Sequence, residues 1–163
     1  MKIVQWNADG LKTKIYELKD RLIAKDIDIC MIQESKLRIG DPTPRILGYA
    51  ALRDDRKALN GGGLITYIKD TLIFERIGYY TRSATEVMSF RVKLARNQWL
   101  QLTNVYAPPR NTIGHDASKI ATEIINVTDN SIIAGDFNAH SPIWDHTHPC
   151  LLYTSDAADE EAS

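Results

Sequence analysis

Four segments with the residue pattern of β-strands end in side chains that can do chemistry. Asn7, Glu34, Tyr106 and Asp136 stand at these strand ends or directly after them. Ligands of α/β sheets gather beyond the carboxyl ends of the strands, so we expect the four side chains to meet at one rim. Two carboxylates and an amide oxygen are ligands that suit Mg²⁺. A divalent metal beside a phosphate in turn indicates phosphoryl or phosphodiester chemistry.

Each of these residues also has a purely structural interpretation. A carboxylate or amide at a strand end commonly stabilises a turn, and Asn138 fits that description too. Asp9 could cap the helix that follows it, and Tyr106 could be a half-buried strand aromatic. The functional interpretation depends on their joint occurrence at strand ends. The chain has no Cys–His spacing of the zinc type, so we do not expect a zinc site.

The loops contain further candidates. The three consecutive glycines at 61–63 predict a turn rather than a phosphate-binding loop, because no Lys-Ser/Thr pair follows them. Nearby, Arg56 and Lys57 are candidates for contact with a nucleic-acid backbone, with a solvated loop as the alternative. Three histidines follow the last predicted strand: His140, His146 and His148. We do not expect them to bind metal, because no strand or helix holds them.

Alternating strands and helices must position these residues. A strand over 2–7, an amphipathic helix from Leu11 to Lys25 and a buried apolar strand over 27–33 predict a βαβ unit. A second amphipathic helix is expected around 117–125. The remaining strands are expected at 49–53, 63–68, 72–77, 87–94, 99–106 and 131–136. The class is mixed α/β with a substantial antiparallel part.

Composition is that of a globular protein, with 163 residues, 44% hydrophobic and 25% charged side chains. No apolar run is long enough to span a membrane, and no signal-peptide pattern opens the chain. The formal charge of −1 includes four carboxylates in residues 150–163, and without them it becomes +3, which permits a nucleic-acid partner. Residues 150–160 resemble a translated sequencing-library adaptor, with a solvated acidic tail as the alternative. We therefore expect a domain over 1–149 and a non-native or disordered tail over 150–163.

Four short blocks in order resemble the endonuclease/exonuclease/phosphatase family. They read QWNADGL at 5–11, IQESK at 32–36, NVYAPP at 104–109 and GDFNAH at 135–140. The last two are most similar to the apurinic-type endonuclease domain of jockey-like non-LTR retrotransposons. The resemblance implies a four-layer α/β (α+β) sandwich, in which two mixed β-sheets are flanked by helices. It also implies that the second sheet is incomplete in this chain.

The resemblance also implies a role for each matching residue. Glu34 would bind Mg²⁺ or Mn²⁺, with Asn7 and Asp9 supporting the metal and phosphate site. Asp136 would orient or deprotonate the attacking water, and Asn138 would hold the phosphate or the nucleophile. Tyr106 would contact the scissile phosphate. Lys36 would organise the carboxylates or contact DNA.

The implied activity is Mg²⁺-dependent nicking of double-stranded target DNA, at a nuclear site of action. In this group the domain precedes a reverse transcriptase. The family's closing Ser-Asp-His block, expected about 60–90 residues downstream of the last match, has no counterpart here. This copy is therefore expected to have little or no activity. The alternatives are a phosphatase of the same fold acting on lipid or inositol phosphates, and a non-enzymatic DNA-binding remnant. The oligomeric state is not predicted.

Overall fold

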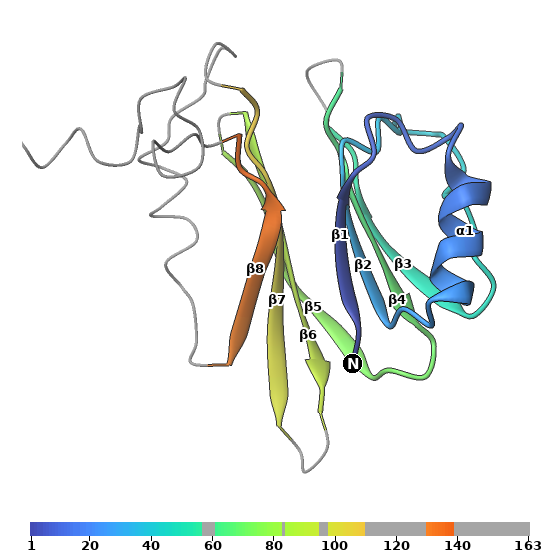
Figure 1. The fold of residues 1–163 in the computed structure, drawn as a ribbon. Helices are drawn as coiled ribbons and strands as arrows, with labels where there is room; N and C mark the ends of the chain where they lie inside the picture. The colour runs from blue at the N-terminus through green and yellow to red at the C-terminus, as the bar shows by residue number, and fades with distance from the viewer. Residues whose placement is uncertain (57–60, 83, 95–97, 110–129, 139–163) are drawn as a thin grey trace, which may run out of the picture.

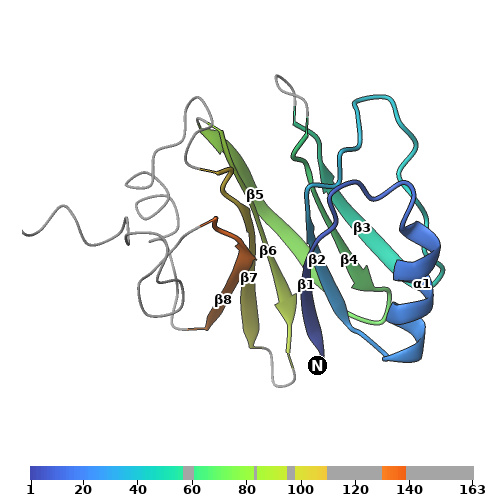
Figure 2. The ribbon, with the colours of Figure 1, turned by 45° about the horizontal axis from the view of Figure 1, so that its top comes forward.

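Two β-sheets packed face to face form the body of the molecule (Figures 1 and 2). The computed structural model describes residues 1–56, 61–82, 84–94, 98–109 and 130–138. Within these residues a single helix lies against the outer face of the first sheet. The arrangement confirms the predicted sandwich of two mixed sheets with a helix outside.

The first sheet contains the predicted βαβ unit. Its strand order is β1 (Ile3–Asn7), β2 (Ile29–Gln33), β4 (Leu64–Lys69) and β3 (Tyr49–Asp54). Strands β1 and β2 are parallel and are joined through helix α1 (Ile15–Ala24), whereas β4 is antiparallel to both of its neighbours. The sheet is therefore mixed.

The second sheet is an antiparallel meander with one parallel strand added at its edge. Its order is β5 (Phe74–Arg82), β6 (Thr85–Lys93), β7 (Trp99–Tyr106) and β8 (Ser131–Asp136). Strand β8 pairs parallel to β7, with Asp136 opposite Tyr106. Parallel β1–β2 and parallel β7–β8 point the same way, so their carboxyl ends share one end of the sandwich (Figure 1).

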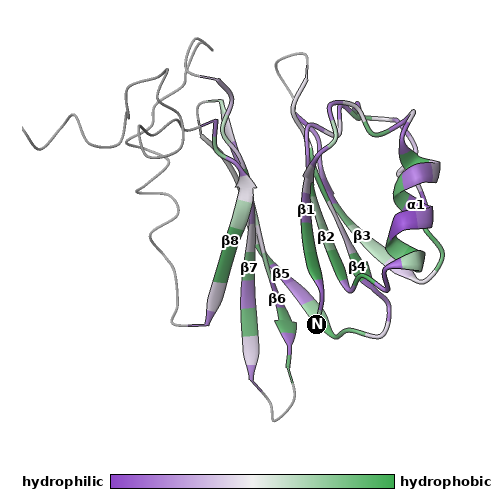
Figure 3. Cartoon of the chain, in the orientation of Figure 1, coloured by the Kyte–Doolittle hydropathy of each residue, from purple (hydrophilic) through white to green (hydrophobic). Residues whose placement is uncertain are grey.

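Strand β2 is buried on both faces because two cores meet on it. Its residue Cys30 packs toward α1, where Leu18 and Leu22 provide the helix side of the core. Met31, pointing the other way, packs between the sheets with Phe90. Figure 3 shows the matching pattern, with hydrophobic bands along β2 and alternating polar and apolar bands on α1. Because β2 is packed on both faces, its direction is fixed, and with it the position of the residues that follow the strand.

The helix begins later than the sequence pattern predicts. Leu11 fits the helical spacing, yet α1 begins at Ile15. The backbone N–H groups of Gly10 and Leu11 instead donate to the carbonyls of Glu34 and Ser35, at 2.8 and 2.9 Å. These bonds tie the β1–α1 connection to the end of β2, where it cannot be helical. Asp9 does not cap the helix, whose N-cap residue makes no side-chain capping bond.

Several predictions lie outside the described residues. They concern the helix around 117–125, the histidines at 140, 146 and 148, Lys57, and the tail over 150–163. In the described part of the chain no helix is long and apolar enough to cross a membrane.

Candidate functional site

The side chain of Asn7 joins the two sheets at the carboxyl ends of their strands. Its Nδ2 donates to Oε1 of Glu34 at 3.0 Å and to Oδ2 of Asp136 at 2.6 Å. An amide nitrogen has two hydrogens, so Asn7 uses both on carboxylates that arrive from opposite sheets. Its Oδ1 accepts the backbone N–H of Asp9 at 3.1 Å, which fixes the orientation of the amide. The structure thus brings together three of the residues predicted from strand ends.

Left-handed backbone conformations surround this contact. Glu34, Asp9, Asn138 and Lys36 have φ values of 49°, 44°, 44° and 51°. For residues other than glycine this conformation is uncommon and costs on the order of 1–3 kcal/mol at each position. Such strain persists where the surrounding structure holds the chain firmly, and it concentrates at functional sites. Here the backbone N–H of Lys36 donates to Gly62 O at 2.9 Å, which helps to hold the turn.

Asn138 positions Asp136 from the far side. Its backbone N–H donates to Oδ1 of Asp136 at 3.0 Å, while its Nδ2 donates to the carbonyl of Ala107 at 2.8 Å. The Asp136 carboxylate therefore has one oxygen on Asn138 and the other on Asn7.

Tyr106 supplies a hydroxyl that stays protonated. Its side chain is buried, and burial, followed by the negative charge and hydrogen bonding of Glu34, raises its pKa far above the ordinary value of 10.0. A phenol that remains neutral can donate a hydrogen bond to a charged oxygen. The guanidinium of Arg56 lies over the Tyr106 ring, 5.5 Å from its centroid, and helps to fix the ring.

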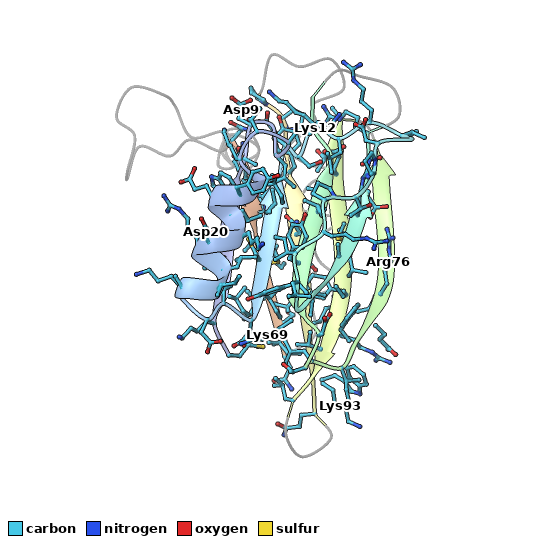
Figure 4. All side chains as sticks on the ribbon, turned by 90° about the vertical axis from the view of Figure 1, so that its right-hand side faces the viewer. Asp9, Lys12, Asp20, Lys69, Arg76 and Lys93 are labelled. Carbon is cyan, nitrogen blue, oxygen red and sulfur yellow. The ribbon has the colours of Figure 1, made fainter. Side chains whose placement is uncertain are left out.

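Lys36 supplies a positive charge between two of the acidic side chains. Its ammonium group is hydrogen-bonded to Oδ1 of Asp9 and lies 3.6 Å from Oε2 of Glu34. The bond lowers the pKa of the Asp9 carboxyl and raises the pKa of Lys36. Figure 4 shows Asp9 at the end of the molecule opposite Lys69 and Lys93. The position of Lys36 shows that a cation is favourable beside these carboxylates.

The donor set fits a hard divalent cation only partly. Glu34 and Asp136 present carboxylate oxygens of the kind that Mg²⁺ prefers, but Asn7 turns its amide nitrogen to them and its oxygen to the backbone N–H of Asp9. Within the described segments no group of three or more His, Cys, Asp or Glu side chains is arranged to hold a metal ion. The side chain of Asp9 is 71% exposed and is turned to Lys36 rather than to Glu34.

Arg56 is a buried structural residue in this structure. Its side chain is 8% exposed and pairs at 3.2 Å with Glu86, which is fully buried. Another guanidinium nitrogen donates to the carbonyl of Ala84 at 2.5 Å. The prediction that Arg56 contacts a nucleic-acid backbone therefore gains no support from its position, because it has partners within the protein.

The sequence reasoning missed Glu86 and the reason for the glycines. Both Gly62 and Gly63 have positive φ, and a Cβ on Gly62 would lie 2.7 Å from Nε of Arg56. The backbone N–H of Gly63 donates to Oε2 of Glu86 at 2.9 Å. The glycine run leads into β4 and packs against a buried ion pair beside Tyr106. Three glycines in succession were the available signal of this close approach.

Comparison with known proteins agrees with the four sequence blocks. The family model described as Endonuclease-reverse transcriptase matches residues 100–160, which include all of β7 but its first residue, all of β8, and three of the site residues. Two curated relatives from Drosophila melanogaster are probable RNA-directed DNA polymerases. That of transposon BS is 29% identical over 152 residues, which are 90% of this chain and 16% of the relative. That of transposon X-element is 27% identical over 146 residues, 88% of this chain and 16% of the relative.

Solved structures share the fold. The endonuclease domain of TRAS1, a telomere-specific non-LTR retrotransposon, superposes with a TM-score of 0.61 at 19% identity. The match covers 86% of this chain and 62% of that one. The chain therefore spans a small part of its curated relatives and about three-fifths of a related domain. Together with the ordered sequence blocks, these matches support the resemblance to the endonuclease/exonuclease/phosphatase family, and within it to the endonucleases of non-LTR retrotransposons.

Proposed function

We propose that this chain provides the site for Mg²⁺-dependent hydrolysis of a DNA phosphodiester, nicking a double-stranded target for retrotransposition. The single observation that carries the proposal is the bridge from Asn7 to Glu34 and Asp136, which gathers two carboxylates from separate sheets. The names of the relatives support a setting in a longer protein with an RNA-directed DNA polymerase. In this proposal the polymerase lies downstream, and the site acts on DNA in the nucleus.

Glu34 would hold the metal, with Asn7 and Asp9 in support, and Mn²⁺ would fit the same oxygen ligands. When bound, the divalent ion supplies positive charge that stabilises negative charge developing on the phosphate oxygens. Lys36 contacts the same two acidic side chains, Asp9 and Glu34. Its ammonium would organise these carboxylates or contact DNA.

The second sheet supplies the groups that act on water and phosphate. Asp136 is held by hydrogen bonds from Asn7 and Asn138. One of its two carboxylate oxygens would accept a proton from the attacking water. A general base of this kind is typically worth about 10²–10⁴ in rate. The neutral hydroxyl of Tyr106 would donate a hydrogen bond to a phosphate oxygen. The side chain of Asn138 donates a hydrogen bond to the carbonyl of Ala107. This bond would keep the two residues directly after β8 against the site.

A plasmid-nicking assay paired with Mn²⁺ binding tests the proposal. Because the closing Ser-Asp-His block has no counterpart here, we expect at most a low rate of conversion of supercoiled to nicked circles. That rate should require Mg²⁺, stop with EDTA, and fall in Asp136→Asn and Glu34→Gln. Electron paramagnetic resonance should show weaker Mn²⁺ binding in Glu34→Gln. Glu75→Gln is the matched control, because this half-exposed carboxylate pairs with Arg91 on the second sheet and touches none of the site residues.

The same assays separate the proposal from its alternatives. Nicking that survives Asp136→Asn, or Mn²⁺ affinity unchanged by Glu34→Gln, would contradict the assigned roles. Release of phosphate from phosphoinositides without DNA cleavage would identify a phosphatase. Salt-sensitive DNA binding without Mg²⁺-dependent turnover would identify a binding remnant, since phosphate contacts weaken steeply with salt.

A further inference from the structure

A layer of buried amide side chains lies directly beneath the candidate site, between the two sheets. Gln33 on β2 and Asn104 on β7 are both fully buried. Gln33 immediately precedes Glu34, and Asn104 lies two residues before Tyr106. The layer separates two apolar clusters between the sheets, one around Phe90 and the other around Tyr106.

Asn104 makes three hydrogen bonds, and all three cross to the opposite sheet. Its Oδ1 accepts Nε2 of Gln33 at 2.5 Å. Its Nδ2 donates to the carbonyl of Ile32 at 3.2 Å and to Oγ1 of Thr66 at 3.3 Å. Gln33 in turn accepts a hydrogen bond from Gln5 on β1. One side chain of the second sheet thereby contacts two strands of the first sheet directly and a third through Gln33.

The position is one where an apolar residue would be expected. Along β7 the side chains of Leu100, Leu102 and Tyr106 face the other sheet, and Asn104 occupies the inward position between Leu102 and Tyr106. Apolar contacts between sheets have no direction, so they allow one sheet to slide over the other. Hydrogen bonds in a dry interior are directional, and a slide would leave buried amides without partners, which is costly.

We infer that Asn104 is a positioning residue that locks the relative register of the two sheets and so places Glu34 against Tyr106 and Asp136. The site is built across the sheet interface, with Asn7 and Glu34 on one side and the other two residues on the other. Reacting groups must be held very precisely, and a displacement of about 1 Å can cost on the order of 10²-fold in rate. The hydrogen bonds of Asn104, two residues before Tyr106 on β7, supply that precision. This inference rests on the proposed function for its catalytic consequence, but its structural part stands on its own.

The test compares Asn104→Leu with Thr103→Val. Both residues are buried on β7, and Thr103 loses a 3.1 Å hydrogen bond to Ser89, its neighbour within the same sheet. Spin labels attached at Ala51→Cys in β3 and Lys93→Cys in β6, both exposed positions, report the distance between the two sheets. Cys150→Ser is added to the labelled protein so that buried Cys30 is the one natural cysteine left. We expect one narrow distance distribution for the parent and for Thr103→Val, and a broadened or shifted one for Asn104→Leu.

Nicking kinetics provide the second readout. Asn104→Leu should lower kcat by about 10²-fold with little change in KM for DNA, whereas Thr103→Val should stay within about threefold of the parent at a similar urea midpoint. An unchanged distance distribution in Asn104→Leu, or an equal loss of kcat in both variants, would overturn the inference.

A double variant keeps the test decisive if Asn104→Leu folds poorly. Gln33→Leu/Asn104→Leu removes both buried partners, so the urea midpoint should recover while the broad distance distribution remains. Recovery of a narrow distribution as well would show that the amides serve stability alone. If the parent chain does not nick DNA, the proposed function fails, and the distance measurement still decides the role of Asn104.

Discussion

The buried ion pair between Arg56 and Glu86 makes a quantitative prediction about stability. The two side chains are 8% and 0% exposed, and their closest nitrogen and oxygen are 3.2 Å apart. Replacing Arg56 with Met should leave a buried carboxylate whose remaining described partner is the backbone N–H of Gly63. Breaking a buried pair in this way costs about 3–5 kcal/mol, a large part of the roughly 5–15 kcal/mol that stabilises a typical domain.

The cost of Arg56→Met should depend on pH. Burial raises the pKa of the Glu86 carboxyl above its ordinary value of 4.5 even with Arg56 present. A carboxyl whose pKa is higher in the folded state takes up a proton on folding, so its destabilising effect is complete above the folded pKa. The effect is relieved as the pH falls toward 4.5. We therefore expect Arg56→Met to lose less stability at about pH 5 than at about pH 7.

Urea denaturation followed by circular dichroism measures both effects. Arg56→Met/Glu86→Leu should be more stable than Arg56→Met, because no buried charge is left unpaired. The control is Arg21→Met, which breaks an exposed pair with Glu17 and should cost less than about 1 kcal/mol. A cost below about 1 kcal/mol for Arg56→Met, or one that is the same at both pH values, would refute the reasoning.

Three further predictions concern the rim of the site. Gly63→Ala should lower the urea midpoint, because its φ is +86° and the new Cβ would lie 2.7 Å from Oγ of Ser35; an unchanged midpoint would contradict this. Tyr106→Phe should reduce nicking about 10-fold or more, since a hydrogen bond to a charged group is lost; because burial raises the pKa of Tyr106, the ultraviolet absorbance change of the parent near pH 10.0 should be the same in the variant. Lys36→Met should return the lowered pKa of Asp9 toward 3.8 in a carbon-13 NMR titration. The stabilisation from Asp9 is present above pH 3.8 and lost as the pH falls through the lowered pKa, so a titration unchanged by Lys36→Met would disprove the pairing.

Local patterns predicted the strand ends that carry the site. The bounds of β7 and β8 follow from short apolar segments bounded by turn residues, and they agree with the structure. The carboxyl ends of parallel strands lie at one rim of the sheets. The sequence alone therefore predicts that Asn7 lies near Glu34 and Asp136. The structure confirms this proximity, whereas their catalytic roles stay a prediction.

Other features depend on contacts between distant residues, which a local pattern does not contain. Arg56 was interpreted as a surface cation because its partner Glu86 lies 30 residues away in sequence. The helix begins after Leu11 because the backbone there bonds to the end of β2 rather than to the next helical turn. Asn104 interrupts an inward apolar stripe, and that interruption was the one local sign of the amide layer.

Strand β8 has a consequence for how the site is lost. Among the described segments it is the edge strand of its sheet and is only partly buried, yet it carries Asp136, which meets Asn7 across 129 positions of sequence. Edge elements with few buried contacts open by local unfolding at a lower free energy than the whole domain. Mild heat or denaturant should therefore separate Asp136 from Asn7 and Glu34 while β1, β2 and α1 remain folded. The temperature and denaturant range over which the site is intact is then set by local unfolding of β8 rather than by unfolding of the whole domain.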